Sequence, residues 1–383
     1  QWITTPFSII VSHYLQKLVK RYATNLTVIT HSAQLIERIM QLQSNLTAEQ
    51  IAKLIMQAGD IVNMYTNLLI KDCMDAFDWA VNIDRRSNDP VIPSVLIAPL
   101  RLMLEFVLNY NYLEDPATGL KYRQHSGIAM GSNCSADLAN LTCFYLEFSQ
   151  VTKHPPLLLT RYLDDLFAIR TSDSKFNLDY GSTMGIVWTE PSRTVDYLDM
   201  RINFSPSDGF TFKVHQKPLN AYQYPHYDSN ISISVKRGFI KGELIRYVRI
   251  CSKRIDYDWM REVFKARLLH RGYPKSFIDS IYNQVPWALK GSFFLPPNST
   301  NSKRDAHTPL IFRVRYDDRL QLHRFLGPDL RRGWKRLILD HDFVTSVQPP
   351  MICHTIQRKL KSDLIRADYK KLEERMSQKL NRS

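Results

Sequence analysis

The sequence predicts an α+β fold, in which helices pack against one face of an antiparallel sheet. Two strand-like apolar runs, 157–160 and 166–169, flank two adjacent acids and are typical of a hairpin with the acids at its tip. Two further runs, 197–204 and 210–214, also have the composition of strands and would complete the sheet. Apolar residues at helical spacing near the start of the chain, and again from residue 236, supply the helices.

Length, composition and charge indicate a folded protein of several domains with a polyanionic partner. The chain has 383 residues, of which 44% are hydrophobic, and this is enough to form ordinary cores. The formal net charge is +14, but residues 211–300 hold 15 Lys or Arg against 6 Asp or Glu, and residues 301–383 hold 19 against 10. A basic second half indicates binding to a polyanion, although it would equally suit a ribosomal or membrane-surface protein.

The cysteines and the longest apolar region argue against disulfides, structural zinc and a membrane span. Five widely spaced cysteines without a Cys-x-x-Cys pair predict free thiols in a reducing compartment. The apolar region 91–113 carries Arg101 and Glu105 and is interrupted by Pro93 and Pro99, which is typical of a buried helix. We therefore expect an intracellular protein with no membrane partner.

The first 58 residues are expected to form three helices that lead to the first strand. Apolar residues recur at helical spacing from 6 to 20, and a second helix is predicted at 32–42. A capping box at 47–50 opens a third helix, which is expected to end near residue 57. The first strand is then predicted at 60–65.

The segment between this strand and the acidic hairpin is expected to be mainly helical. Helices are predicted at 70–81 and 91–109, followed by a hairpin at 109–124. The next stretch, 127–135, contains two glycines that permit close approach of the backbone to a ligand, and a helix is expected after it through Glu147. Taken alone, that stretch could equally be a plain junction between a loop and a helix.

The two adjacent acids, Asp164 and Asp165, are the strongest candidates for chemistry. Neighbouring carboxylates on one tight turn repel each other, and a divalent cation with a preference for oxygen ligands, such as Mg²⁺, would neutralise them. The alternative is an acidic surface turn, because turns favour Asp in any case.

The second half of the chain offers candidate nucleic-acid contacts. Arg246, Arg249 and Lys253 recur at helical spacing opposite an apolar stripe. Such a basic face is either simply exposed to solvent or lies along the phosphate backbone of a nucleic acid. A loop-like stretch at 286–308 predicts a domain boundary. Two later features complete the list: an aromatic among four cations at 331–336, and a helix of mixed charge at 358–382.

Three stretches resemble, in order, the catalytic motifs of reverse transcriptases. Asp60 followed five residues later by Tyr65 is similar to the first motif, and Tyr162-Leu163-Asp164-Asp165 is similar to the third. Residues 127–135 and 136–140 between them resemble the loop and helix that hold the template and the incoming nucleotide. Later stretches resemble the reverse transcriptases of Penelope-like retroelements: Tyr197-Leu198-Asp199-Met200, Gln216-Lys217-Pro218, Arg271-Gly272-Tyr273-Pro274, Pro350-Met351-Ile352 and Leu364-Ile365-Arg366-Ala367.

The resemblance implies the fold of a right-hand polymerase, with an antiparallel split βαβ palm and a helical thumb. Four domains are then expected: a helical fingers-side lead-in at 1–58, a palm with a fingers insertion at 59–215, a thumb at 216–295 and a basic C-terminal extension at 296–383.

The resemblance also implies roles for individual residues. Asp60 and Asp164 would bind two Mg²⁺ ions, or Mn²⁺ in their place, with Asp165 supporting them and Ile61 included among the metal-binding positions. Tyr65 would lie under the sugar and exclude a 2′-hydroxyl. Further nucleotide-binding positions are implied at Met130, Gly131 and Ser132, and positions that clamp the duplex at Lys236, Arg246, Arg249 and Lys253.

The implied function is that of an RNA-directed DNA polymerase, with an RNA template, a DNA primer and deoxynucleoside triphosphates as its partners, in the nucleus or the mitochondrion. The alternative is a domesticated or organelle-encoded descendant that binds nucleic acid or a ribonucleoprotein without polymerising. Residues 1–58 contain neither the Lys-containing nor the Arg-Pro-containing fingers motif that grips the triphosphate in this family. We therefore expect an upstream segment or a partner chain to supply those cations.

Overall fold

The computed structural model describes residues 3–23 and 26–293, two strands at 311–315 and 351–355, and positions 328, 332 and 333. The chain divides into two compact units. The first consists of residues 1–220 and 249–260, and the second of residues 221–248 and 261–383. The predicted features at 331–336 and 358–382, like most of the loop predicted at 286–308, lie outside the described residues.

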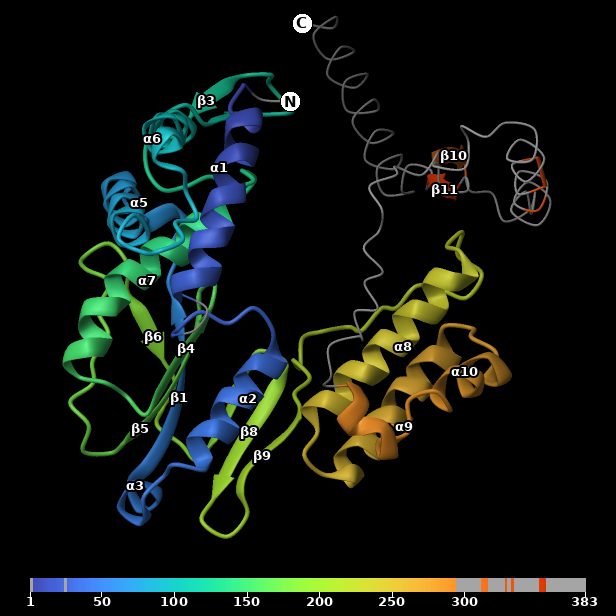
Figure 1. Cartoon of the computed structure of the whole chain (residues 1–383). Coiled ribbons are helices and arrows are strands. Elements are labelled where there is room, and N and C mark those ends of the chain that lie inside the picture. The colour runs from blue at the N-terminus through green and yellow to red at the C-terminus, as the bar shows by residue number, and fades with distance from the viewer. Residues whose placement is uncertain are drawn as a thin grey trace, which may run out of the picture. The chain divides into compact units, whose positions relative to one another are not determined.

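A four-stranded antiparallel sheet forms the centre of the first unit (Figure 1). Its strands are β4 (Leu158–Tyr162), β5 (Asp165–Thr171), β1 (Leu54–Ile61) and β6 (Ile186–Trp188), in that order across the sheet. The strands β4 and β5 form the predicted hairpin, and β5 pairs with β1 over seven residues. Gly59 is required in β1 because a Cβ atom there would lie 2.7 Å from the ring of Trp188 on β6.

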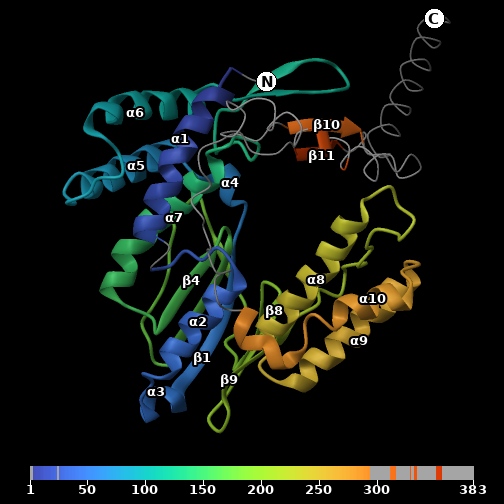
Figure 2. The same cartoon turned by 45° about the vertical axis from the view of Figure 1, so that its right-hand side comes forward.

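Helices cover one face of this sheet, as the sequence predicts. They are α1 (Thr5–Leu18), which continues as a π-helical turn (Val19–Ala23), α5 (Ile70–Asp84), α6 (Ser94–Asn109) and α7 (Ser135–Lys153). Both Figure 1 and Figure 2 show α1 lying along α7. Leu166 and Ala168 of β5 point into the apolar core that these helices share.

The opposite face is covered by a second sheet, and this corrects the prediction of a single one. The strands predicted at 197–204 and 210–214 belong to a separate antiparallel sheet of β7 (Thr194–Tyr197), β8 (Met200–Ser205) and β9 (Gly209–Val214). Phe167 of β5 packs on Tyr197 of β7, with ring centroids 5.2 Å apart. Residues 166–169 are all buried, so the central sheet requires a layer on both faces.

The first strand begins and ends earlier than predicted. The third helix, α3 (Ala48–Lys53), has the expected capping box between Thr47 and Gln50, but β1 follows it directly at Leu54. Asp60 therefore lies near the end of the strand and not at its start. Asn63, with a φ of 50°, turns the chain into the short helix α4 (Met64–Asn67). Periodicity cannot distinguish helix from strand in the short apolar run at 54–58, and pairing with β5 decides in favour of the strand.

Two further predicted elements are present. The second helix is α2 (Ser32–Gln43), and the hairpin before the glycine loop consists of β2 (Tyr112–Glu114) and β3 (Lys121–Arg123).

The second unit is largely helical. It contains most of α8 (Ile233–Ile250) and α9 (Arg254–His270), then α10 (Lys275–Tyr282) and a 3₁₀-helical stretch (Trp287–Phe293). Aromatic side chains from α8 and α9 meet in its core, where the rings of Tyr247 and Phe264 lie 5.6 Å apart. The two later strands, β10 (Ile311–Arg315) and β11 (Met351–Thr355), pair in parallel. In the described part of the chain, no helix is long and apolar enough to cross a membrane.

Candidate active site

Asp60 and Asp165 lie directly opposite each other on β1 and β5. Side chains alternate along a strand, so both acids point to the same face of the sheet as Phe167, the face covered by β7. Asp60 is exposed and Asp165 is partly buried. The hydroxyl of Tyr197 on β7 donates a hydrogen bond of 2.9 Å to the main-chain carbonyl of Asp165, which fixes the start of β5.

Asp164 lies in the two-residue connection between β4 and β5. The preceding residue, Leu163, has a φ of 55°, a left-handed conformation that costs a residue with a side chain about 1–2 kcal/mol. The carbonyl of Asp164 accepts a hydrogen bond of 3.0 Å from the main-chain N–H of Ile61, so the turn is tied to the end of β1. Pairing of the hairpin with β1 thus brings Asp60, Asp164 and Asp165 together.

The charges of these acids oppose one another. Burial, followed by the charge of Asp164, raises the pKa of Asp60 above its ordinary value. The pKa of Asp165 is raised in the same way by burial, by Asp164 and by Asp60, and is lowered in part by the charge of Lys217. A bound cation would relieve this repulsion.

The three carboxylates supply oxygen donors of the kind that Mg²⁺ prefers. Among the described residues, no group of three or more His, Cys, Asp or Glu side chains is placed so that it could hold a metal ion. Ile61 has a buried, apolar side chain, so only its main-chain carbonyl could serve as a ligand. The chemistry of these donors therefore suits a divalent cation, which would lie near the end of β1 and the turn.

Tyr65 and the glycine loop lie against each other beside the acids. The main-chain N–H of Ile128 donates a hydrogen bond of 2.7 Å to the carbonyl of Tyr65. Gly127 has a φ of 73°, and a Cβ atom there would lie 2.6 Å from the same carbonyl oxygen, so only glycine permits this approach. Burial and the nearby charge of Asp164 raise the pKa of the half-buried Tyr65. The first and second motifs are therefore in direct contact.

Met130, Gly131 and Ser132 line a cavity of about 630 Å³ next to this contact. Met130 is 73% exposed, and the hydroxyl of Ser132 lies 3.6 Å from the sulfur of Cys134. The walls come from the start of α1, from the hairpin of β2 and β3 and from the glycine loop, and none of the lining residues is charged.

The four basic positions differ in their surroundings. Lys236 is 4% exposed, and its ammonium donates to the main-chain carbonyls of Tyr227 and Ser229, so it holds the loop before α8 together. Arg246 belongs to the second unit and pairs with Glu243 at 2.7 Å. Arg249 and Lys253 belong to the first unit, where Lys253 lies 3.4 Å from Asp208.

Two residues near the acids were not singled out in the sequence analysis. Lys217 was noted only as part of the stretch Gln216-Lys217-Pro218, yet its charge acts on Asp165. Arg161 is fully buried one residue before Tyr162. The signal for Arg161 was a cation inside an otherwise apolar strand.

Comparisons with known proteins give distant matches. Residues 223–283 match the family described as the animal helix-turn-helix domain. Telomerase from Candida albicans in complex with a fragment of telomeric RNA is 14% identical with a TM-score of 0.42, and the match covers 76% of this chain and 54% of that one. Apo telomerase from Candida tropicalis is 12% identical with a TM-score of 0.43, covering 74% of this chain and 50% of that one.

An RNA polymerase complex inside a double-stranded RNA virus is also similar, at 8% identity and a TM-score of 0.40, covering 63% of this chain and 23% of that one. The chain spans about half the length of the telomerases that it matches. No curated protein sequence matches it. At such low identities and TM-scores, these likenesses carry no residue role and no activity over to this chain.

Proposed function

We propose that this chain is an RNA-directed DNA polymerase that extends a primer by two-metal nucleotidyl transfer. The observation that carries the proposal is the meeting of Asp60 and Asp165 across β1 and β5, with Asp164 in the turn beside them. Three mutually repelling acids at the rim of a sheet weaken the metal-free protein, and their placement is understandable if they hold cations. The order of the motifs along the chain, and their resemblance to reverse transcriptases, support the same assignment.

In this reaction the 3′-hydroxyl of a primer attacks the α-phosphorus of a nucleotide and pyrophosphate leaves. Two Mg²⁺ ions supply stabilisation of charge on the attacking and leaving oxygens. Asp60 and Asp164 would bind both ions, while Asp165 supports them and the main-chain carbonyl of Ile61 completes the set. Asp60 and Asp165 come from two paired strands and Asp164 from the turn that leads into one of them, so pairing of β1 with β5 fixes the separation of Asp60 and Asp165.

Tyr65 and the glycine loop would position the nucleotide. The ring of Tyr65 lies close enough to Asp164 for that charge to raise its pKa, which suits a side chain under the sugar of a nucleotide bound at the acids. In this role it excludes a 2′-hydroxyl and selects deoxynucleotides. The nucleotide and the template would also be contacted by Met130, Gly131 and Ser132, which line the cavity beside the contact between Tyr65 and the glycine loop.

The parts of the chain are proposed to take the places of a right-hand polymerase. Residues 59–215 would form the palm with its fingers insertion, residues 1–58 the lead-in on the fingers side, residues 216–295 the thumb and residues 296–383 a basic extension. Arg246, Arg249 and Lys253 are the proposed phosphate contacts. We leave Lys236 out of this set because its ammonium is buried against main-chain carbonyls.

The proposal is tested by Mg²⁺-dependent primer extension on matched RNA and DNA templates. We expect the chain to incorporate deoxynucleotides on an RNA template and to lose this activity when the metal is chelated. Binding of primer and template without incorporation, at any concentration of Mg²⁺ or Mn²⁺, would instead favour the non-polymerising descendant that binds nucleic acid.

A further inference from the structure

A fully buried ion pair lies beneath the acidic turn. The side chains of Arg161 on β4 and Glu147 on α7 are both 0% exposed, and Nε of Arg161 donates to Oε1 of Glu147. Burying two charges is costly unless their remaining hydrogen-bonding groups also find partners. Glu147 meets this condition, because its carboxylate also accepts from the hydroxyls of Thr27 at 2.5 Å and Tyr180 at 2.6 Å.

The other end of the Arg161 guanidinium reaches the turn itself. Nη1 donates to the main-chain carbonyl of Leu163 at 2.9 Å and to Oδ1 of Asn140 at 2.9 Å, and Nη2 donates to the carbonyl of Asn140 at 3.0 Å. Leu163 is the left-handed residue directly before Asp164. The side chain of Arg161 thus links α7 to Leu163, the residue whose conformation sets the position of the two acids that follow it.

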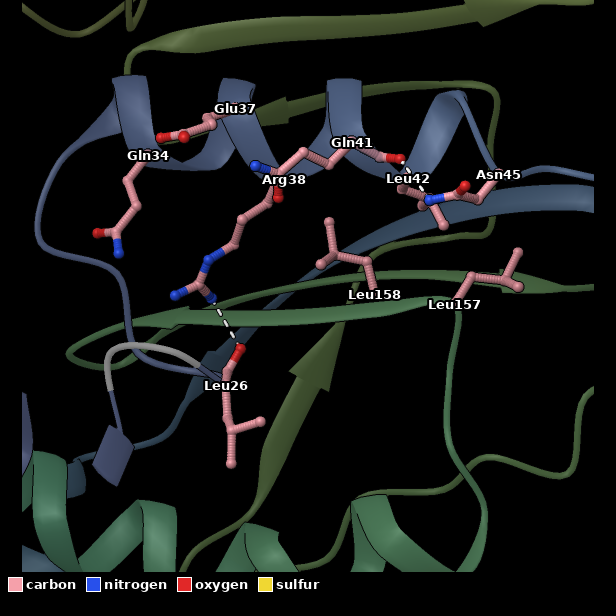
Figure 3. Close-up of a pocket in the computed structure, with 9 residues that line it drawn as sticks. All are labelled: Leu26, Gln34, Glu37, Arg38, Gln41, Leu42, Asn45, Leu157 and Leu158. Atoms are coloured by element: carbon pink, nitrogen blue, oxygen red, sulfur yellow. Dashed lines mark hydrogen bonds between the residues drawn. The ribbon is translucent and has the colours of Figure 1, made fainter. Parts of the chain in front are cut away.

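The main chain of Arg161 is held as well. Its N–H donates to the carbonyl of Thr27 at 2.8 Å, and its carbonyl accepts from Ile29 at 2.9 Å. Segment 26–29 is fixed in turn by Arg38 of α2, which donates to the carbonyls of Leu26 at 2.8 Å and Val28 at 3.1 Å. Figure 3 shows Arg38 reaching from α2 toward Leu26 across a pocket of about 430 Å³.

We propose that Arg161 is a positioning residue that holds the Leu163 carbonyl and so presents Asp164 and Asp165 in a fixed geometry before any metal binds. An arginine is required because its planar fork donates from three nitrogens to four acceptors, which lie on Glu147, Asn140 and Leu163, whereas lysine has a single ammonium nitrogen. The consequence of this placement for catalysis rests on the proposed function, but the placement itself is a property of the chain alone.

A purely structural role is the competing explanation, in which the pair only joins β4 to α7. The two explanations differ at Leu163. If Arg161 positions the turn, removing its bond to Leu163 loosens residues 163–166 selectively. If the pair only supports the core, removing a hydrogen bond of Glu147 should speed exchange of the turn as much as removing one of Arg161.

The experiment measures amide hydrogen exchange of the metal-free chain by mass spectrometry, in peptides that cover 159–169. Arg161→Lys should speed exchange of the turn amides about tenfold. This is the factor expected when the loss of one hydrogen bond makes local opening of the turn easier. Tyr180→Phe removes a hydroxyl donor to Glu147 and should leave the turn within about twofold of wild type. Arg170→Lys is the matched control, because Arg170 lies on the same hairpin and bonds Gln57 on β1.

Equal acceleration of the turn by Arg161→Lys and Tyr180→Phe, or a turn unchanged in Arg161→Lys, would overturn the proposal. Should Arg161→Lys fail to fold, Asn140→Ala takes its place. It removes the Oδ1 acceptor that steadies Nη1 and should speed exchange at residues 163–166 without changing the rest of β4 and β5. A turn that exchanges as in wild type in this variant would also overturn the proposal.

Binding of Mn²⁺, followed by electron paramagnetic resonance without nucleic acid, provides the second readout. We expect Arg161→Lys to weaken Mn²⁺ binding about tenfold, since the loosened turn must be ordered when the ion binds. Unchanged Mn²⁺ affinity alongside a loosened turn would show that the position of the turn does not matter for the metal. A wild-type chain that neither binds Mn²⁺ nor extends a primer would refute the proposed function, while the exchange result would still decide the role of Arg161.

Discussion

Asp60 and Asp165 occupy directly opposed positions on β1 and β5, so two carboxylates share one cross-strand site at the end of the paired strands. Like charges at such positions destabilise a sheet. The raised pKa of each acid reflects its partial burial and the further charge of Asp164. The repulsion between these carboxylates lowers the stability of the sheet at this rim.

Replacing Asp60 or Asp164 by Asn should abolish primer extension and leave binding of primer and template nearly unchanged. In the proposed function the carboxylates would hold the metals, whereas phosphate contacts by basic side chains dominate affinity for nucleic acid. Extension and filter binding measured on the same preparations check this. Asp173→Asn is the control, since Asp173 follows the same hairpin but pairs with Lys53. A variant at Asp60 that extends as well as wild type would refute the metal assignment.

Asp165→Asn should raise the melting temperature of the metal-free chain at pH 7, by about 2–4 °C if the relieved repulsion is near 1 kcal/mol. The folded-state pKa of Asp165 lies above its ordinary value, so its contribution to stability is full below the unfolded-state pKa and is lost as the pH rises through the folded-state pKa. The advantage of the variant should therefore shrink as the pH falls toward 4. Thermal melts across this range, without divalent ions, measure it; a gain that grows in acid would contradict the prediction.

Tyr65→Ala should admit ribonucleotides, with a smaller loss for deoxynucleotides, because the excluded group is a single hydroxyl. The measurement is the ratio of kcat/KM for the two nucleotide types on one template. Tyr65→Phe keeps the ring and should keep the discrimination. If Tyr65→Ala discriminates as wild type does, the residue is not the sugar gate.

Replacing Arg246, Arg249 or Lys253 singly by Gln should weaken binding to every nucleic-acid sequence alike and reduce the salt dependence by about one unit for each lost phosphate contact. Titrations at several salt concentrations give the slope. Lys71→Gln is a suitable control, since Lys71 is an exposed cation on α5 paired with Asp75. An unchanged slope at a given position would mean that its side chain only faces solvent.

The sequence predicted the α+β class and the hairpin that carries Asp164, because alternating and periodic apolar patterns are local. The same patterns could not place the start of β1, since 54–58 suits either a helix or a strand until β5 pairs with it. Nor could they show that the strands after Tyr197 form a second layer. That outcome depends on burial of both faces of β5, which only the assembled fold reveals.

The acids of the candidate site could be predicted from the sequence, but the residues that hold them in place could not. Asp60, Asp164, Asp165 and Tyr65 were found from motif order. The register that sets Asp60 against Asp165 joins residues more than a hundred positions apart, which no local pattern encodes. Arg161 was missed because its partner Glu147 is on a different element, and a buried charge is recognised only when both partners are seen.

The first unit is built from two separate segments of the chain, and this constrains the order in which the protein can fold during synthesis. Its strand β1 has no partner until β5 leaves the ribosome, because Leu54 pairs with Thr171. The same unit then takes in residues 249–260, after 28 residues that belong to the second unit have been made. Completion of the first unit must therefore wait until the chain has been translated past residue 260, and until then the nascent chain is exposed to misfolding and to capture by chaperones.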